Sequence, residues 1–547
     1  MTIVRDSIYA FMRETGMTTV FGNPGSTELP FYRDWPDEFR YVLGLQESAV
    51  LSMADGFAQA TGKAALVNLH SAAGLGHALG SLVTAYKNQT PLVVTAGQQS
   101  RRLLLAEPFL GAVDAASFPK PYVKWAHEAA LPSETPRALA RAWAIAMTPP
   151  RGPVFLSIPA DDWEAPAEFV TPLDIRGASA PSADAIATAA AQIDKSAKPV
   201  IVAGGEVDKS ENWSGIATLA EKLACPVWTA SMSPRGCFPE SHPQFAGFLR
   251  ADHTSVAEAL GKHDLILVIG APAFTFHFDH PSPHTFDTPV IQITCDANTA
   301  SYTRHGLAMI ADLHETIAAL TAATKTKPPF TGEPLRKPPQ PGRATNGFGH
   351  AVASDVRKAL EPLTKGAGET RDAGLTSLAA IDLIQALRPA DCLIAEEAPS
   401  ARMHVQQRLR IDRPQSFFAT ASGGLGFAAS AAVGLALGKP DRHTLALLGD
   451  GSSLYTIQAL WTAAQENAPV IFVILNNGGY EALKMIAQRM QTPSVGADLP
   501  GLDFLSLAKG FGLPAKRATT AAGLHAALSE AFSKPRPMLI DVIVNDD

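Results

Sequence analysis

Short apolar runs rich in valine, isoleucine and leucine alternate along this chain with longer amphipathic stretches. The runs predict strands at 18–22, 65–70, 92–97, 153–158, 199–205, 228–233, 265–270 and 290–295, and again at LALL (445–448) and VIFVIL (470–475). Continuous apolar runs separated by helix-length segments are typical of parallel sheets that are buried on both faces. We therefore expect an α/β protein with three Rossmann-like parallel-sheet domains.

Two passages interrupt this alternation. Residues 174–186, DIRGASAPSADAI, are low in charge and rich in Pro, Ser, Gly and Ala, which predicts a first linker. Residues 325–345, KTKPPFTGEPLRKPPQPGRAT, carry enough prolines to forbid a helix, so we expect an extended, exposed segment. The predicted domains span 1–175, 182–325 and 373–547, and a Pro-rich linker spans 326–372.

Composition narrows the class of protein. A chain of 547 residues is too long for one core. Its net charge of −7 argues against nucleic-acid or anionic-membrane partners. The four cysteines are far apart, without a CxxC pair, which suits a reducing compartment. No run approaches the roughly 20 apolar residues of a membrane span, and the N-terminus lacks a secretion signal. We expect a cytoplasmic protein with no nucleic-acid or membrane partner.

Polar residues follow the two C-terminal apolar runs directly. Gly449-Asp450-Gly451 comes after the first run and Asn476-Asn477 after the second. A carboxylate and a carboxamide at neighbouring strand ends are hard oxygen ligands, suited to a Mg²⁺ ion that also holds a phosphate. The glycines let the backbone approach an anion closely, and a helix expected after Gly451 would direct its first amides at that charge.

Gly-Leu-Gly occurs twice, in SAAGLGHALGSLVTA (71–85) and in TASGGLGFAASAAVG (420–434). We place both at strand-to-helix junctions. Either tight junctions simply favour glycine, or the first and third domains are related folds. Residues 74–80 do not make a dinucleotide fingerprint, because the third glycine comes one place late and no acidic residue follows at the expected distance.

The separation of Asp450 from Asn477, 477 − 450 = 27 positions, resembles the signature of thiamine-diphosphate enzymes. Further segments, including VFGNPGSTELPF, LQESAVLSMADGFAQA, LVNLHSAAGLGHALGSL and ALWTAAQENAPVIFVILNNGGYEALK, resemble the benzoylformate decarboxylases within the pyruvate-decarboxylase-like family. The resemblance covers nearly the whole chain. It implies pyrimidine-binding, middle and diphosphate-binding domains, thiamine diphosphate and Mg²⁺ as cofactors, and decarboxylation of a small-molecule 2-keto acid to an aldehyde and CO₂. It also implies a homotetramer with active sites at dimer interfaces.

The resemblance assigns roles to residues that have plainer explanations by themselves. Glu47 would be the carboxylic acid against the pyrimidine ring, although a helix N-terminus also favours an acid. Ser26 would bind the substrate carboxylate, although Ser26 or Thr27 in NPGST could simply cap a helix. His70 and His277 would move protons, although a histidine at a strand end is often structural.

The remaining implied assignments concern the cofactor, the metal and the substrate pocket. The Mg²⁺ ligands would be Asp450, Asn477 and Gly479; other cofactor contacts would be Gly423, Leu425, Gly449, Gly451, Ser452 and Tyr480; the substrate pocket would comprise Phe109, Leu110, Pro399, Leu483, Met485 and Ile486.

This sequence departs from the family pattern in the pocket. Met485 and Ile486 stand where members that prefer aryl substrates carry bulky aromatics, and Pro399 stands where a hydroxyl residue is usual. Two rival functions remain open: a carboligase or acetolactate-type synthase, and a non-catalytic cofactor-binding paralogue. The presence of both histidines counts against the first, and the intact Glu47, Asp450 and Asn477 count against the second.

Overall fold

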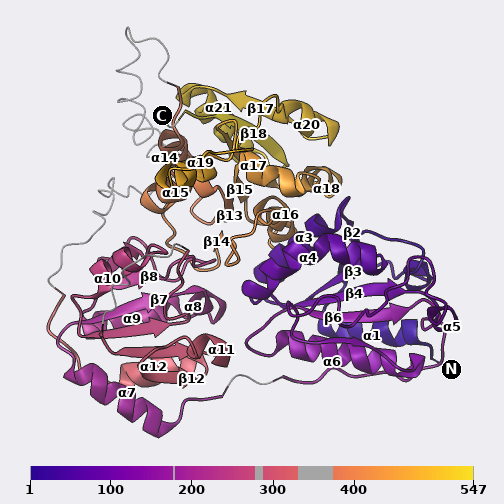
Figure 1. Ribbon diagram of the computed structural model, residues 1–547, viewed down its shortest axis with the longest axis horizontal. Helices are drawn as coiled ribbons and strands as arrows, with labels where there is room; N and C mark the ends of the chain where they lie inside the picture. Colours follow the sequence, from indigo (N-terminus) through magenta and orange to yellow (C-terminus); the bar gives the residue numbers. More distant parts are fainter. Residues whose placement is uncertain (1, 176–178, 278–286, 331–373, 546–547) are drawn as a thin grey trace. The chain divides into compact units, whose positions relative to one another are not determined.

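A computed structural model describes residues 2–175, 179–277, 287–330 and 374–545 (Figure 1). These residues form two compact units. The first unit comprises the described parts of 1–175, 358–407 and 422–547; the second comprises those of 176–357 and 408–421. The predicted linker at 326–372 lies almost wholly outside the described residues.

The N-terminal part of the first unit contains a six-stranded sheet of order β2-β1-β3-β4-β6-β5. Its strands are β1 (Thr19–Gly22), β2 (Arg40–Leu43), β3 (Ala65–Leu69), β4 (Leu92–Gln98), β5 (Ala126–Glu128) and β6 (Val154–Pro159). Its helices are α1 (Val4–Thr15), α2 (Leu29–Tyr32), α3 (Glu47–Thr61), α4 (Ser71–Lys87), α5 (Arg101–Leu104), η1 (Pro132–Glu134) and α6 (Thr135–Met147).

The C-terminal part of the chain contains a second six-stranded sheet, of order β14-β13-β15-β16-β18-β17. Its strands are β13 (Leu393–Glu397), β14 (Phe417–Phe418), β15 (Thr444–Gly449), β16 (Val470–Asn476), β17 (Ala515–Ala518) and β18 (Met538–Ile543). Its helices are α14 (Ser377–Leu387), η2 (Pro399–Ala401), α15 (Arg402–Arg408), α16 (Ala428–Gly438), α17 (Asp450–Ser453), η3 (Leu454–Thr456), α18 (Ala459–Gln465), α19 (Glu481–Arg489), α20 (Phe504–Gly510) and α21 (Ala521–Ser533).

The middle sheet has a different order, β12-β11-β10-β7-β8-β9. Its strands are β7 (Pro199–Ala203), β8 (Val227–Thr229), β9 (Phe245–Phe248), β10 (Leu265–Ile269), β11 (Val290–Thr294) and β12 (Gly306–Ile310). Its helices are α7 (Ala183–Lys195), α8 (Gly205–Lys209), α9 (Trp213–Leu223), α10 (His253–Leu260), α11 (Ala297–Ala300) and α12 (Leu313–Ala323). Because α7 begins at Ala183 behind a Ser182 cap, the predicted linker at 174–186 was too long at its C-terminal end.

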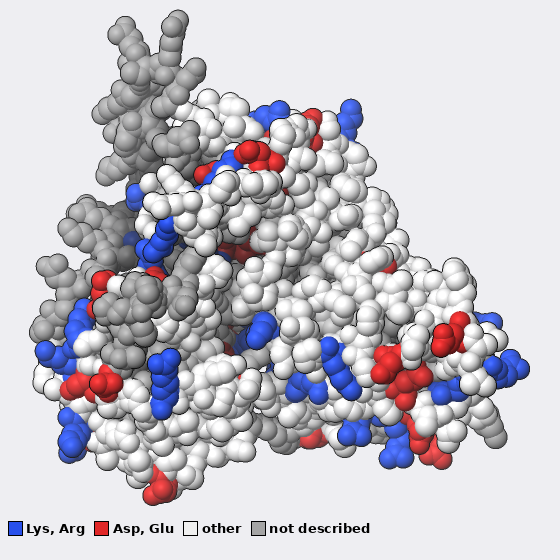
Figure 2. Space-filling model, in the orientation of Figure 1, with Lys and Arg blue, Asp and Glu red and all other residues white. Residues whose placement is uncertain are grey.

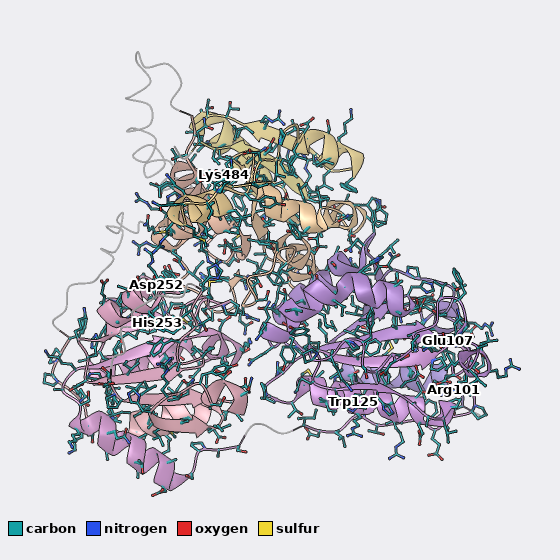
Figure 3. The ribbon with its side chains drawn as sticks, viewed as in Figure 1. Arg101, Glu107, Trp125, Asp252, His253 and Lys484 are labelled. Atoms are coloured by element: carbon teal, nitrogen blue, oxygen red, sulfur yellow. The ribbon has the colours of Figure 1, made fainter. Side chains whose placement is uncertain are left out.

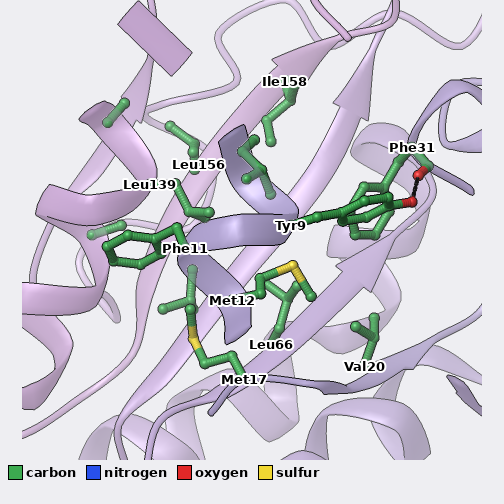
Figure 4. Close-up of a cluster of buried hydrophobic side chains, with 14 of the residues drawn as sticks. Tyr9, Phe11, Met12, Met17, Val20, Phe31, Leu66, Leu139, Leu156 and Ile158 are labelled. Carbon is green, nitrogen blue, oxygen red and sulfur yellow. Dashed lines mark hydrogen bonds between the residues drawn. The ribbon is translucent and has the colours of Figure 1, made fainter. Parts of the chain in front are cut away.

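The prediction of three parallel-sheet α/β domains is confirmed. Strands β3, β4, β7, β10, β11 and β15 are buried along their whole length, which explains why they read as continuous apolar runs. In the N-terminal domain α1 and α6 press an aromatic and aliphatic cluster against the sheet, including Tyr9, Phe11, Phe31 and Leu139 (Figure 4).

The first and third sheets share one topology. Numbered within its own domain, each has the strand order 2-1-3-4-6-5, whereas the middle sheet has the order 6-5-4-1-2-3. This identity favours the interpretation that the first and third domains are related folds. The Gly-Leu-Gly repeat was nevertheless a poor guide, because Gly74 lies inside α4, after the third strand, and Gly424 precedes α16, after the second.

The helices that are equivalent in this topology, α3 and α16, pack directly against each other (Figure 1). A Cβ on Gly434 would lie 1.8 Å from the Met53 carbonyl oxygen, and a Cβ on Gly56 would lie 2.1 Å from the Ala431 carbonyl oxygen. Glycine is therefore required on both sides of the contact. Because Ser52 also reaches the Gly426 carbonyl oxygen at 3.3 Å, the two helices run in the same direction and begin at the same end.

Candidate active site

The carboxyl ends of β15 and β16 bring the predicted metal ligands together. The two strands pair in parallel register, with Gly449 opposite Leu475, so Asp450 and Asn477, which directly follow β15 and β16, lie at the same edge of the sheet. Asp450 is the first residue of α17 and is buried. Its Oδ1 accepts the Gly451 N–H at 2.6 Å and its Oδ2 accepts the Gly479 N–H at 2.9 Å. The predicted helix after Gly451 forms in three pieces, α17 up to Ser453, then η3 and α18, before β16 begins.

Three oxygen atoms converge at this edge. The side-chain oxygen of Asn477 faces Asp450 Oδ2 at 3.2 Å and the Gly479 carbonyl oxygen at 2.8 Å. Without a cation, the amide would gain two hydrogen bonds by turning its nitrogen toward these oxygens. Oxygens bound about 2.1 Å from an octahedral Mg²⁺ lie about 3.0 Å apart, close to both separations. Burial also raises the pKa of Asp450, because the charged carboxylate is disfavoured away from water, and a bound cation would stabilise that charge. The donor set therefore fits Mg²⁺.

Close packing surrounds this oxygen cluster. A Cβ on Gly451 would lie 2.3 Å from the Tyr480 ring, so glycine is needed for the turn to close over that ring. Ser452 Oγ donates to the Glu397 carbonyl oxygen at 2.6 Å and accepts the Gly449 N–H at 3.1 Å. The Gly-Asp-Gly turn is thus tied to the end of the neighbouring strand β13.

Glu397, which the sequence analysis overlooked, holds a second loop. It is the buried last residue of β13. Its Oε1 accepts the Gly426 N–H at 2.6 Å, and its Oε2 accepts the Phe427 and Ala428 N–H groups at 2.7 Å each. Burial raises the pKa of Glu397 to about 7, although these three N–H groups act in the opposite direction. The carboxylate thereby fixes the start of α16, directly after Leu425.

The loop before α16 contains the predicted cofactor contacts Gly423 and Leu425. Gly423 has a φ of +73°, a left-handed conformation that favours glycine, and Leu425 is half-buried. Ser422 Oγ accepts the Gly424 N–H at 2.9 Å. Pro399, a predicted pocket residue, is exposed and begins η2 just after Glu397.

Glu47 lies at the N-terminus of α3, as predicted, where Gln46 caps the helix. Its side chain is only 12% exposed. Its Oε2 lies 3.1 Å from His77 Nδ1, and the Asn23 amide nitrogen donates to its Oε1 at 3.4 Å. The carboxyl is thus largely withdrawn from water but keeps polar partners in its own domain.

Ser26 and His70 lie in neighbouring turns at the carboxyl edge of the first sheet. Ser26 is exposed and does not cap α2, whose N-cap is Glu28; the capping explanation for Ser26 and Thr27 was therefore wrong. His70 follows β3 directly and precedes Ser71, which has a φ of +54°. Its Nδ1 lies 2.8 Å from Glu28 Oε2, a buried partner that the sequence analysis also missed.

His277 belongs to the second unit. Its backbone N–H donates to the Ala251 carbonyl oxygen at 2.8 Å, and the ring of the preceding residue, Phe276, stacks on His253 with centroids 3.6 Å apart. Figure 3 labels His253 beside Asp252, which caps α10. His277 is thus placed within its own unit, and its role in the site stays a prediction.

Apart from Pro399, the predicted pocket residues lie on two exposed segments of the first unit. Phe109 is 86% exposed, and Leu110 has a φ of +63°. On α19, Leu483 and Met485 are each 54% exposed and Ile486 is half-buried; no residue of this helix is buried within its own chain.

One ion pair within α19 and one to the segment that follows it involve Lys484. Lys484, which is labelled in Figure 3, has its Nζ 2.9 Å from Asp498 Oδ1 and 3.4 Å from Glu481 Oε2. Gly479, one of the predicted metal ligands, pairs with Asp498 through an isolated antiparallel bridge. The helix that carries three of the predicted pocket residues is therefore connected to the oxygen cluster.

Comparisons with known proteins agree with this geometry. Three domain families match in order: the thiamine pyrophosphate enzyme N-terminal TPP binding domain at residues 2–118, the central domain at 186–320 and the C-terminal TPP binding domain at 398–542. Benzoylformate decarboxylase of Pseudomonas aeruginosa is 41% identical over 549 residues, with 99% of each chain covered. The chain belongs to the thiamine-diphosphate enzymes.

Two further members of this thiamine-diphosphate enzyme family show whether the chain is more similar to decarboxylases or to acetolactate synthases. A solved structure described as a thiamine diphosphate-dependent 4-hydroxybenzoylformate decarboxylase of Rhodococcus jostii RHA1 superposes with a TM-score of 0.90 at 37% identity, covering 100% of both chains. The large subunit of acetolactate synthase isozyme 1 of Escherichia coli is 27% identical, covering 98% of this chain and 93% of its own. The chain is thus more similar to the decarboxylases.

Neither the distribution of charge on one face nor the arrangement of possible metal ligands reveals a further candidate site among the described residues. Charged groups of both signs are scattered over the face in Figure 2, without a broad basic patch among the described residues. In the part of the chain that the structure describes, no cluster of three or more His, Cys, Asp or Glu side chains could hold a metal. No helix in those same ranges is long and apolar enough to cross a membrane.

Proposed function

We propose that this chain decarboxylates a 2-keto acid of the benzoylformate type without oxidation, giving an aldehyde and CO₂. The observation that carries the proposal is the 41% identity to a benzoylformate decarboxylase along the full length of both chains. The oxygen cluster at Asp450, Asn477 and Gly479 supports a requirement for Mg²⁺ as well as thiamine diphosphate.

When bound, thiamine diphosphate supplies the carbon nucleophile and the electron sink that decarboxylation of a 2-keto acid requires. Glu47 would hold a proton at its carboxyl against the pyrimidine ring, and its low exposure suits that task. Ser26 Oγ would donate to the substrate carboxylate. His70 and His277 would accept and return protons at the substrate oxygen and carbon, since imidazole works in both directions near neutral pH.

Glu397 and Ser452 would support the diphosphate half of the site. The Glu397 side chain holds the loop that carries Gly423 and Leu425, and Ser452 holds the Gly449–Gly451 turn against the same strand end. Two loops that must contact one cofactor would then keep a fixed spacing.

The substrate would be apolar and not strictly aromatic. Met485 and Ile486 give α19 aliphatic side chains, and Phe109 offers an aromatic surface on another segment. Apolar pockets discriminate substrates only modestly by size, so branched aliphatic acids should compete with benzoylformate.

Exposed apolar side chains support an assembly of at least two chains, and we propose a homotetramer. Leu105, Phe109 and Val113 are 99%, 86% and 88% exposed, which is unusual for so many large apolar groups in one short segment. A second copy would cover them, and the cofactor would lie between Glu47 of one chain and Asp450 of the other. We place this assembly in the cytoplasm.

The deciding experiment measures CO₂ release from benzoylformate and from aliphatic, branched and indolic 2-keto acids. Release that requires both thiamine diphosphate and Mg²⁺ is the expected result. An acetolactate-type synthase would also release one CO₂ for every two pyruvate molecules, but its product would be a 2-hydroxy-3-oxo acid that joins the acyl group of one molecule to the second, and no free aldehyde would form. Bound cofactor without turnover of any acid would indicate a non-catalytic paralogue.

A further inference from the structure

A buried carboxylate with four donors lies next to His70. Glu28 is 1% exposed. Its Oε1 accepts the Gly97 N–H at 2.9 Å and the Thr27 hydroxyl at 2.6 Å. Its Oε2 accepts the Gly25 N–H at 3.0 Å and lies 2.8 Å from Nδ1 of His70. Each oxygen of the Glu28 carboxylate therefore has two hydrogen-bond partners, so the carboxylate has little freedom to rotate.

These contacts determine which nitrogen of the ring carries hydrogen. The Thr27 hydroxyl gives its single hydrogen to Glu28, so its oxygen, 3.1 Å from His70 Nδ1, is also an acceptor toward the ring. Nδ1 thus faces two acceptors, and it must be the donor. In the neutral imidazole Nε2 is then the unprotonated nitrogen.

The backbone also fixes the plane of the ring. A Cβ on Gly25 would lie 2.0 Å from His70 Nδ1, so the imidazole rests directly on the Gly25 backbone. The His70 side chain is 22% exposed, which leaves part of the ring accessible. Because the Gly25 backbone packs against the His70 ring and Glu28 accepts the Nδ1 hydrogen, the ring can exchange protons with a substrate only through Nε2.

We propose that Glu28 is a positioning residue that locks His70 in the Nδ1–H tautomer, so that a proton enters and leaves the ring at Nε2 alone. This inference rests on the proton-transfer role of His70 in the proposed function. Its chemical balance is simple: neutral His70 takes one proton at Nε2 from the reaction, and the imidazolium returns that proton from the same atom. No redox partner is involved.

The Glu28→Gln substitution tests the lock because an amide has one oxygen and one NH₂ group. If the NH₂ group faces His70 it donates to Nδ1 and inverts the tautomer; if it faces Gly97 it leaves that N–H unpaired. We expect ¹⁵N spectra of the histidine-labelled holoenzyme to show Nδ1–H for His70 in the wild type and mixed or inverted tautomers in the variant. A His70→Asn sample assigns the signal.

The kinetic result expected with Glu28→Gln is a kcat lower by a factor of about 10 or more, with a smaller change in KM, since a general acid–base contributes about 100-fold or more. Glu38→Gln is the matched control, because Glu38 is exposed in the same domain and pairs only with Arg13 among the contacts described. It should change neither the kcat nor the tautomer.

Three results would overturn the proposal. The first is a wild-type ring that carries its hydrogen on Nε2, a measurement that needs no variant to fold. The second is a variant that keeps Nδ1–H while kcat falls, which would make Glu28 merely structural. The third is a variant with an inverted tautomer and an unchanged kcat. Failure of the proposed function would look different, because the wild type would release no CO₂ while its tautomer remained locked.

Discussion

The contact between α3 and α16 predicts a large effect from one added methyl group. In Gly434→Ala the new Cβ would lie 1.8 Å from the Met53 carbonyl oxygen and 2.6 Å from the Phe57 nitrogen. Contacts of this kind do not occur below 3.0 Å, and both neighbours are backbone atoms, so the helices must separate. Overpacking costs about 1–3 kcal/mol, and alanine regains up to about 1 kcal/mol of helix propensity. Because no side chain can yield, we expect a net loss near 2 kcal/mol.

Gly510→Ala is the matched control for this substitution. Gly510 ends α20, is exposed, and has nothing within 4 Å of an added Cβ. It should leave the unfolding midpoint unchanged or raise it slightly. Urea unfolding would be followed by fluorescence, and hydrogen exchange would be read on peptides covering 47–61 and 428–438. A Gly434→Ala protein with a wild-type midpoint and unchanged exchange in both helices would refute the reasoning.

Three further outcomes follow from the site. Burial raises the folded-state pKa of Glu397 from 4.5 to about 7, so the protonated side chain stabilises the fold below pH 4.5 and this contribution is lost as the pH rises through 7. The unfolding free energy of the wild type, measured relative to that of Glu397→Gln, should therefore fall by about 3 kcal/mol between pH 4.5 and 8. A difference between the two proteins that stays constant with pH would contradict this. Asp450→Asn should weaken Mg²⁺-dependent binding of thiamine diphosphate by more than about 10-fold in a titration of the apoenzyme, and unchanged affinity would remove Asp450 from the metal site. Glu47→Gln should slow exchange of the cofactor C2 proton by at least about 100-fold while binding stays nearly intact; wild-type exchange would exclude Glu47 from the chemistry.

The strands that could be predicted share a physical cause. The strands given by residue range in the sequence analysis all lie in the interior of their sheets, where burial on both faces produces an unbroken apolar run. The edge strands β5 and β17 were missed, because their partly exposed residues read as loops. Strand order was also beyond reach, because hydrophobic pattern does not say which strands are neighbours.

The residues of the candidate site also fall into those that the sequence could predict and those that it could not. Asp450 and Asn477 could be found because both follow apolar runs directly, and parallel strands place their ends together. Glu28 and Glu397 were missed because each acts through backbone N–H groups that come from distant segments: Gly97 for Glu28, and Gly426 to Ala428 for Glu397. An acidic residue at the end of the apolar run LIAEE was the one available signal for Glu397.

The exposure of α19 has a consequence for how this enzyme can diversify. No side chain of the helix is buried within its own chain, so substitutions at Leu483, Met485 or Ile486 remove little core packing. By contrast, the α3–α16 contact tolerates no side chain at Gly56 or Gly434. Substitutions in the proposed pocket on α19 should therefore cost little folding stability, whereas a side chain added at Gly56 or Gly434 would force apart the helices that join the N-terminal and C-terminal domains.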